Sequence, residues 1–178
     1  AADPATGVGP MSTETHFHRV MGYIESGVND GARVVCGGKQ AHVEGCEGGF
    51  YIEPTVLADV SNDMKVAREE IFGPVLVVIK YSDVDEAVRL ANDTPYGLAS
   101  SIWTSDVSRA LRTSHRLQAG VTWVNDHLPI ASEAPHGGVK ASGFGKDMSH
   151  EAVLEHTVTH HVMIRHSEPP DREGFRPA

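Results

Sequence analysis

Residues 74–124 alternate short apolar segments with amphipathic stretches of helical period, and this pattern restricts the possible folds strongly. Residues 75–79 are continuously apolar and mostly β-branched, which predicts a strand covered on both faces. Residues 100–103 and 120–124 predict two more strands, each preceded by an amphipathic helix. Strands that alternate with helices predict an α/β fold, with a mostly parallel sheet and flanking helices.

Polar residues mark where the helices should begin. Ser12 can cap a first helix that covers residues 13–29, and Gly31 is placed to end it. Apolar side chains recur along this helix at three- and four-residue spacing, which predicts one buried stripe. A short helix is also expected over residues 149–156. The caps expected for the two helices between them are Ser82 and either Ser105 or Asp106.

Charge and cysteine content argue against several classes of protein. The 178 residues carry 15 Lys and Arg against 24 Asp and Glu, a net charge of -9. This charge repels phosphate backbones and anionic lipids, so neither nucleic-acid nor membrane-surface binding is expected. No apolar run approaches the roughly 18 residues that a membrane helix needs. Two cysteines are too few for a disulfide scaffold, and the expected compartment is the cytoplasm.

The chain divides into three parts of unequal size. Residues 1–156 hold the strand and helix signals and are expected to form one α/β unit. Residues 157–166 form a final extended segment, and residues 167–178 are a polar, proline-containing tail that we expect to be flexible. The chain begins with Ala1 rather than Met, and its first helix signal comes only near Ser12. We therefore expect a piece of a longer protein.

Cysteine and histidine could supply nucleophilic or metal chemistry, but neither pattern favours it. Cys36 ends an apolar segment, where a free cysteine is expected to be a core residue. Cys46 lies in a glycine-rich loop beside two glutamates, whose charges disfavour a reactive thiolate. His160 and His161 are consecutive in an extended segment and so point to opposite faces. With no HExxH or paired CxxC motif, a metal site is not expected.

Two segments combine residue types that suit a ligand. At residues 69–74, two glutamates, an aromatic residue and Gly-Pro lead into the apolar strand. A glutamate there can accept hydrogen bonds from a sugar diol, and Phe72 offers a flat face to a ring. Residues 125–138 mix apolar residues with two carboxylates, which suits a ligand with a cationic end. The residues alone leave open that the first segment is an ordinary helix end and the second a solvent-exposed loop.

A series of motifs then gives a family resemblance. Residues 69–75 read Glu-Glu-Ile-Phe-Gly-Pro-Val, which resembles a segment of the aldehyde dehydrogenase superfamily. Further motifs follow the order of that family, and the resemblance covers residues 3–166. These motifs are Asp3-Pro4-Ala5-Thr6, Gly37-Gly38, Ile52-Glu53-Pro54-Thr55-Val56, Asn92-Asp93-Thr94-Pro95-Tyr96-Gly97-Leu98-Ala99, Trp123-Val124-Asn125 and Gly137-Gly138-Val139-Lys140.

The resemblance implies an oxidoreductase that converts aldehydes to carboxylic acids. In this family a Cys attacks the carbonyl, hydride passes to NAD(P), and water releases the acid from a thioester. Glu70 matches the ligand for the hydroxyls of the nicotinamide-side ribose, and Phe72 matches the aromatic near the nicotinamide ring. NAD is the expected cofactor, with NADP left open. The positions expected near the substrate tunnel are Leu98, Leu128, Ile130 and His136.

The resemblance also implies which parts of the family's machinery lie elsewhere. The nucleophilic Cys, the basic Glu and the fold for the adenosine half would lie upstream of Ala1. Residues 1–156 would then be the C-terminal part of the catalytic domain, inactive alone. Residues 157–166 resemble a segment that adds a strand across subunits, which implies a homo-oligomer, with dimer and homotetramer both open.

A narrower resemblance concerns the substrate. Residues 132–138, residues 142–149 and His160-His161-Val162-Met163 resemble γ-aminobutyraldehyde dehydrogenases of putrescine degradation. Asp126 and Glu133 near the pocket would favour an ammonium-bearing aldehyde and oppose a carboxylate-bearing one. Betaine aldehyde is the near alternative, although a quaternary ammonium prefers an aromatic cage. The alternative from a different class is a non-catalytic oligomerising module that keeps the fold.

Overall fold

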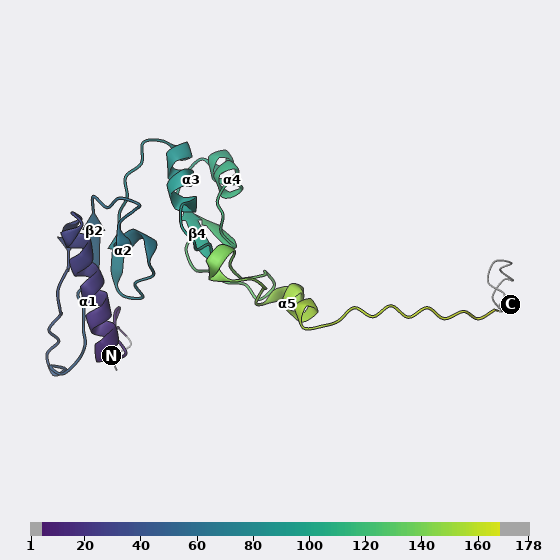
Figure 1. Ribbon diagram of the computed structural model, residues 1–178, viewed down its shortest axis with the longest axis horizontal. Helices are drawn as coiled ribbons and strands as arrows, with labels where there is room; N and C mark the ends of the chain where they lie inside the picture. Colours follow the sequence, from purple (N-terminus) through teal and green to yellow (C-terminus); the bar gives the residue numbers. More distant parts are fainter. Residues whose placement is uncertain (1–4, 168–178) are drawn as a thin grey trace, which may run out of the picture.

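The computed structural model describes residues 5–167 and builds two small sheets with their helices one after the other along the chain (Figure 1). In Figure 1, α1 lies beside β2 and α2, whereas α3 and α4 lie beside β4. The α/β class predicted from the sequence is confirmed. In chain order the elements are α1 (Glu14–Asn29), β1 (Arg33–Cys36), β2 (Thr55–Ala58), α2 (Lys65–Arg68), β3 (Val75–Val77), α3 (Val84–Asn92), β4 (Ala99–Ile102), α4 (Val107–Ser114), β5 (Val121–Val124), the 3-10 helix η1 (Lys140–Ser142) and α5 (Ser149–Glu155).

The two sheets combine parallel and antiparallel pairing. The first sheet has the order β1-β2-β3, in which β1 runs antiparallel to β2 and β2 runs parallel to β3. β4 and β5 form a separate parallel pair, with Ala99 opposite Val121 and Ile102 opposite Val124. Parallel pairing therefore predominates within residues 5–167, as the alternation of strands and helices predicts, and the edge strand β1 departs from it.

The main apolar core lies between α1 and the first sheet. Phe17, Val20 and Ile24 lie on one stripe of α1 and are buried, as their spacing predicts. They belong to the same cluster as Leu57 of β2, which is fully buried. Ile71 joins this cluster from the segment between α2 and β3. The core therefore fixes the Glu-Glu-Ile-Phe-Gly-Pro motif against α1 at Ile71, its third residue.

The helix caps correct the sequence prediction at two helices and confirm it at one. The cap of α1 is Thr13, not Ser12, and its hydroxyl accepts a hydrogen bond from the His16 amide at 3.1 Å. The cap of α3 is Asp83, not Ser82, because its carboxylate accepts a hydrogen bond from the Glu86 amide at 2.8 Å. Asp106, one of the two candidates for α4, caps that helix.

Two expectations about burial are wrong. The continuous apolar character of residues 75–79 predicts cover on both faces, but Leu76 is 61% exposed and Val78 is 40% exposed. No element within residues 5–167 buries that face of β3. Cys36 is exposed rather than part of the core, because β1 is an edge strand with an irregular register between Val34 and Cys36.

The C-terminal region is described as far as residue 167. The predicted short helix is present as α5. Residues 157–166 follow it in an extended path with no strand partner among residues 5–167, and Figure 1 shows this path leading away from α5. Strand addition by this segment stays a prediction. Residues 1–4 and most of the predicted flexible tail, residues 168–178, lie outside the described residues.

Asp59 links both edges of the first sheet and gives a testable pH dependence. Its carboxylate accepts hydrogen bonds from Lys80 Nζ at 2.7 Å and Arg33 Nε at 2.9 Å. These two cations, Lys80 first, lower the pKa of Asp59. A lowered folded-state pKa contributes stability that is present above the ordinary aspartate pKa and lost as the pH falls through the lowered value.

We predict that Asp59→Asn lowers the melting temperature at neutral pH. The difference from wild type should shrink to zero as the pH falls through the lowered pKa of Asp59. Asn tolerates the left-handed backbone at this position, where φ is 57°, so the substitution changes mainly the charge. The check is thermal unfolding of both proteins from neutral to acid pH. A difference that does not change with pH would contradict this assignment.

Candidate functional site

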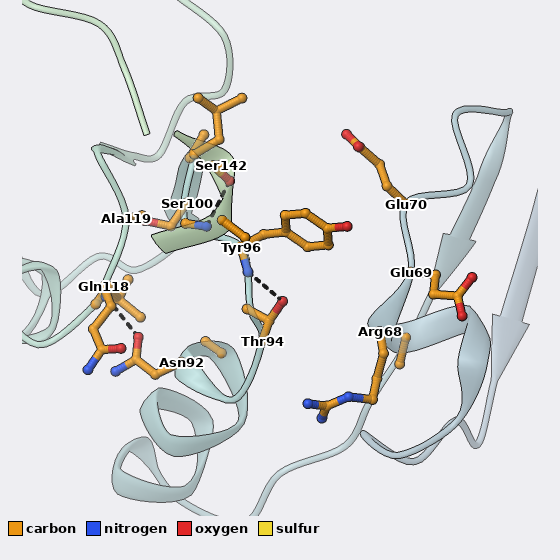
Figure 2. Close-up of a pocket in the computed structure, with 17 residues that line it drawn as sticks. Arg68, Glu69, Glu70, Asn92, Thr94, Tyr96, Ser100, Gln118, Ala119 and Ser142 are labelled. Carbon is orange, nitrogen blue, oxygen red and sulfur yellow. Dashed lines mark hydrogen bonds between the residues drawn. The ribbon is translucent and has the colours of Figure 1, made fainter. Parts of the chain in front are cut away.

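A cleft of about 550 Å³ lies between two halves of the structure, the first sheet with its helices and the second sheet with its helices (Figure 2). The end of α2 and the segment that follows it form one of its walls. Residues 67–70 line this wall. The opposite wall comes from positions within residues 91–100 together with residues 117–119 and 141–142. In Figure 2, Glu70 and Tyr96 project into the space from opposite walls, whereas Glu69 points away from it.

The local sequence turns the chain sharply at the wall that carries Glu70. α2 ends at Arg68, and Glu69 already has an extended backbone. Phe72 has a φ of 56°, in the left-handed region that bulky side chains rarely adopt. At Gly73 a Cβ atom would lie 2.7 Å from Val20 Cγ1, so only glycine lets the chain pass this close to α1. The turn leaves the Glu70 side chain on the cleft and brings the backbone back into β3.

His16, Arg19 and Tyr23 form a row of side chains on α1 that binds this turn. The Tyr23 hydroxyl donates to Glu69 Oε2 at 2.7 Å. Arg19 Nη2 donates to the Glu70 carbonyl at 3.3 Å, and His16 Nε2 lies 2.6 Å from the Phe72 carbonyl. The pKa of Arg19 is raised, first by hydrogen bonding to Tyr23 and further by the charges of Glu69 and Glu70. The turn is therefore bonded to α1 at three points.

The opposite wall is built on close backbone contacts between three segments. The Gly97 carbonyl accepts hydrogen bonds from the Gly120 and Val139 amides, each at 3.0 Å. The Gly97 amide donates to Ser142 Oγ at 3.0 Å. At Gly120 a Cβ atom would lie 1.7 Å from the Gly137 carbonyl oxygen. Glycines at these positions let the loop that carries η1 lie directly on the N-terminal ends of β4 and β5.

The two halves also meet at the rim of the cleft. Arg68 Nη1 lies 3.4 Å from Asp93 Oδ2 and 3.4 Å from the Asn62 carbonyl. Asn62 Nδ2 donates to Asp93 Oδ2 at 2.9 Å. These contacts join the end of α2 to the end of α3, although exposed ion pairs of this kind contribute little stability.

The residues predicted from the sequence fall into three groups. Glu70 and Leu98 line the cleft between the two halves. Leu98 also lines a second cleft of about 460 Å³, and His136 lies on it. Phe72 lines neither cleft and is 72% exposed. The remaining predicted positions line neither cleft and lie in the loop before His136: Asp126, Leu128, Ile130 and Glu133.

The loop of residues 125–138 is ordered by contacts to the second sheet. Trp123 Nε1 donates to the Pro129 carbonyl at 2.9 Å, and the Ser101 hydroxyl lies 2.8 Å from His127 Nδ1. Farther along, His136 pairs with Asp147 in an isolated antiparallel bridge. These contacts carry Leu128 and Ile130 to the surface, where both are exposed. Their place beside a substrate therefore stays a prediction.

Sequence reasoning missed several residues of the cleft. Tyr96 and Arg68 line it, and the α1 residues His16, Arg19 and Tyr23 support it from behind. The signal that was available is the spacing of the three α1 residues, which places them on one side of the helix. Their partners lie 46 to 56 residues away, so the spacing alone did not identify a site.

Neither cysteine belongs to the cleft. Cys36 is exposed, and its Sγ lies 3.7 Å from the Pro54 carbonyl. Cys46 is exposed in the loop before β2. Within residues 5–167, no group of three or more His, Cys, Asp or Glu side chains is placed to hold a metal ion. No helix of the described region has the length and apolar character needed to cross a membrane.

Clefts between packed elements are common places for small ligands, and here the acidic side chain of Glu70 lines such a cleft. The model of the aldehyde dehydrogenase family matches residues 1–162. The chain belongs to the aldehyde dehydrogenase family, as its motifs predict.

Individual relatives agree with this family assignment. An aldehyde dehydrogenase of Enchytraeus buchholzi is 44% identical over 156 residues, which are 86% of this chain and 31% of the relative. A betaine aldehyde dehydrogenase of Bacillus subtilis (strain 168) is 39% identical over 90% of this chain and 33% of its own length. The chain thus spans about a third of the length of these curated relatives.

A solved structure gives the same result in three dimensions. The Mycobacterium tuberculosis aldehyde dehydrogenase, solved in complex with NAD+, is 44% identical and superposes with a TM-score of 0.81. The superposition covers 86% of this chain and 31% of that one. At this identity the likeness extends beyond the general fold, and the partial α/β architecture is that of an aldehyde dehydrogenase.

Proposed function

We propose that this chain is part of an NAD-dependent aldehyde dehydrogenase, and that the cleft lined by Glu70 receives the nicotinamide half of the cofactor. The observation that carries the proposal is the Glu70 carboxylate, which the family's own motif presents on a cleft between two sheets. The NAD+ complex of the Mycobacterium tuberculosis relative supports the choice of cofactor. NADP is the alternative cofactor, and the fold that would choose between the two at the adenosine half is proposed to lie outside residues 1–178.

The donor and acceptor groups of the cleft fit a ribose. A carboxylate accepts hydrogen bonds only, and a ribose diol offers two hydroxyl donors. Among residues 5–167 no protein group hydrogen-bonds the Glu70 carboxylate, so its oxygens remain available to a ligand. Bound NAD would supply the hydride acceptor. Glu70 would bind and orient its ribose, and the exposed ring of Phe72, two residues on, would offer an apolar face to the nicotinamide.

The nucleophile is proposed to lie outside this chain. Cys36 and Cys46 lie off both clefts, so neither thiol is placed to attack a substrate beside Glu70. The thiol that forms the thiohemiacetal and then the thioester would come from a segment outside residues 1–178. Residues 1–178 alone should therefore give no turnover.

An aminoaldehyde such as 4-aminobutanal is the proposed substrate, which would place the enzyme in putrescine degradation. The net charge of -9 and the two acids of the loop, Asp126 and Glu133, favour a cationic aldehyde over an anionic one. Betaine aldehyde is the second candidate, because a Bacillus subtilis relative is named for that substrate. Both candidates carry a positive charge at neutral pH.

The exposed extended segment after α5 supports a homo-oligomer, proposed to be a tetramer. Val158, Val162 and Ile164 are largely exposed on it, and its backbone has no strand partner within residues 5–167. Such a segment can complete a sheet in a neighbouring subunit. The proposed location is the cytoplasm, on the basis of the acidic composition and low cysteine content.

The substrate proposal is tested by NADH formation with the complete gene product that contains residues 1–178. We expect 4-aminobutanal to give the highest kcat/KM, at least about tenfold above succinate semialdehyde. The variants Asp126→Asn and Glu133→Gln should lower the ratio of kcat/KM for 4-aminobutanal to that for succinate semialdehyde. Glu25→Gln, on the exposed face of α1, is the matched control. Preference for the carboxylate-bearing aldehyde, or no NAD reduction with any aldehyde, would contradict the proposal.

A further inference from the structure

Tyr23 is the most firmly held member of the row on α1. Its ring is buried in the main core, with 7% of the residue exposed. Two cations flank the ring, with Lys65 Nζ 5.0 Å and Arg19 Cζ 5.7 Å from its centroid. Because packing fixes the ring, the hydroxyl that donates to Glu69 at 2.7 Å is a fixed point in the structure. Glu69 is thereby held facing away from the cleft.

Arg19 and His16 precede Tyr23 on α1 and bind the motif at Glu70 and Phe72. Arg19 binds the carbonyl of Glu70 itself. A carbonyl oxygen only accepts hydrogen bonds, so the short contact between His16 Nε2 and the Phe72 carbonyl requires the hydrogen to be on Nε2. This bond holds Phe72 in its left-handed backbone conformation, which is unfavourable for an aromatic residue without such support.

The three bonds constrain the backbone on both sides of Glu70 and leave its carboxylate free. They engage the Glu69 side chain, the Glu70 carbonyl and the Phe72 carbonyl. Glu69 and Glu70 line the cleft and Phe72 comes two residues after Glu70, whereas the three donors lie on α1, outside both clefts. These three α1 residues can therefore affect the cleft only through residues 69–72, which they bind.

We propose that Tyr23, with Arg19 and His16, is a positioning residue that fixes the direction of the Glu70 carboxylate toward the cofactor. This inference rests on the proposed function, because it takes the ligand of Glu70 to be NAD. Holding the segment in its binding geometry before NAD arrives removes an ordering cost from the binding step. Loss of the Tyr23 hydroxyl should therefore weaken NAD binding without changing the chemistry of the aldehyde.

The test uses Tyr23→Phe in the complete gene product that contains residues 1–178. Phe keeps the buried ring and removes only the hydroxyl. We expect the Kd for NAD to rise about three- to tenfold, less than for a lost contact to NAD itself, because the hydroxyl acts only through the segment that it holds. The KM for the aldehyde should stay unchanged, and the melting temperature should stay close to that of wild type. Tyr81→Phe is the matched control, because Tyr81 is exposed and lines neither of the two clefts.

A double-mutant cycle separates positioning from general stability. If the Tyr23 hydroxyl acts through Glu69, the variant Glu69→Ala should raise the Kd for NAD, and adding Tyr23→Phe should raise it little further. Fully additive effects on the Kd would overturn the inference. A fall in melting temperature with no change in the Kd for NAD would show that the hydrogen bond merely joins α1 to α2, and would also overturn it.

The variant Glu70→Gln distinguishes failure of this inference from failure of the proposed function. If Glu70→Gln weakens NAD binding while Tyr23→Phe does not, the cofactor site stands and the positioning role is wrong. If wild type does not bind NAD, or if Glu70→Gln binds it equally well, the proposed function is wrong and the inference is wrong with it.

Discussion

Gly120→Ala is expected to disrupt the wall of the cleft opposite Glu70. A Cβ atom at this position would lie 1.7 Å from the Gly137 carbonyl oxygen and 2.8 Å from its carbonyl carbon. Both are backbone atoms, so no side-chain rotation relieves the overlap, and the loop of residues 137–142 must move off the second sheet. Overpacking of this kind destabilises by about 1–3 kcal/mol or more. Because Gly97 and Ser142 hydrogen-bond through the same loop, the cleft should open as well.

Thermal unfolding and NADH formation together measure this effect. The expected result is a lower melting temperature and a loss of aldehyde oxidation by the complete gene product. Gly22→Ala is the matched control, because a Cβ there meets no atom within 4 Å and the position is inside α1. That control should be neutral or stabilise by about 0.5–1 kcal/mol. If Gly120→Ala behaves like the control, the close approach of the loop to the second sheet is wrong.

The local features of the fold were predictable from the sequence. The apolar stripe of α1 and the position of Gly31, whose φ is 104°, depend on neighbours a few residues away. The predicted caps were one residue too early at Thr13 and at Asp83, since adjacent polar residues compete for the same free amides. Predictions from spacing therefore succeeded for the existence of helices and were less accurate for their first residues.

The parts that could not be predicted depend on contacts between distant segments. Leu76 is apolar in sequence yet exposed, because burial depends on what packs against a strand and not on its own composition. The loop at residues 125–138 is held by contacts such as the bond between Trp123 and Pro129, which have no periodic signature in the sequence. Of the candidate site, the family motif identified Glu70 and its wall, whereas Tyr23 required the packing of α1 against that motif.

Glu70→Gln is expected to give a large loss of cofactor affinity with little change in the structure. Gln keeps the length of the side chain, but its amide replaces one of the two acceptor oxygens and removes the charge. Hydrogen bonds to a charged group contribute about 1.5–3 kcal/mol, so a Kd for NAD at least about tenfold higher is predicted. The bonds from Arg19 to the Glu70 carbonyl and from Tyr23 to Glu69 do not involve the substituted group. The variant should therefore unfold at the wild-type temperature.

The most direct test of whether this cleft is a cofactor site is the Kd for NAD. It is measured by calorimetric titration of the complete gene product as wild type, Glu70→Gln and Glu25→Gln. Glu25 is exposed on α1 and is not among the residues that line the cleft, so its variant changes the charge equally without changing the site. Our account predicts that wild type and Glu25→Gln bind NAD with the same affinity, and that Glu70→Gln binds it at least about tenfold more weakly. Equal affinities for all three proteins would contradict the assignment of Glu70 to the cofactor.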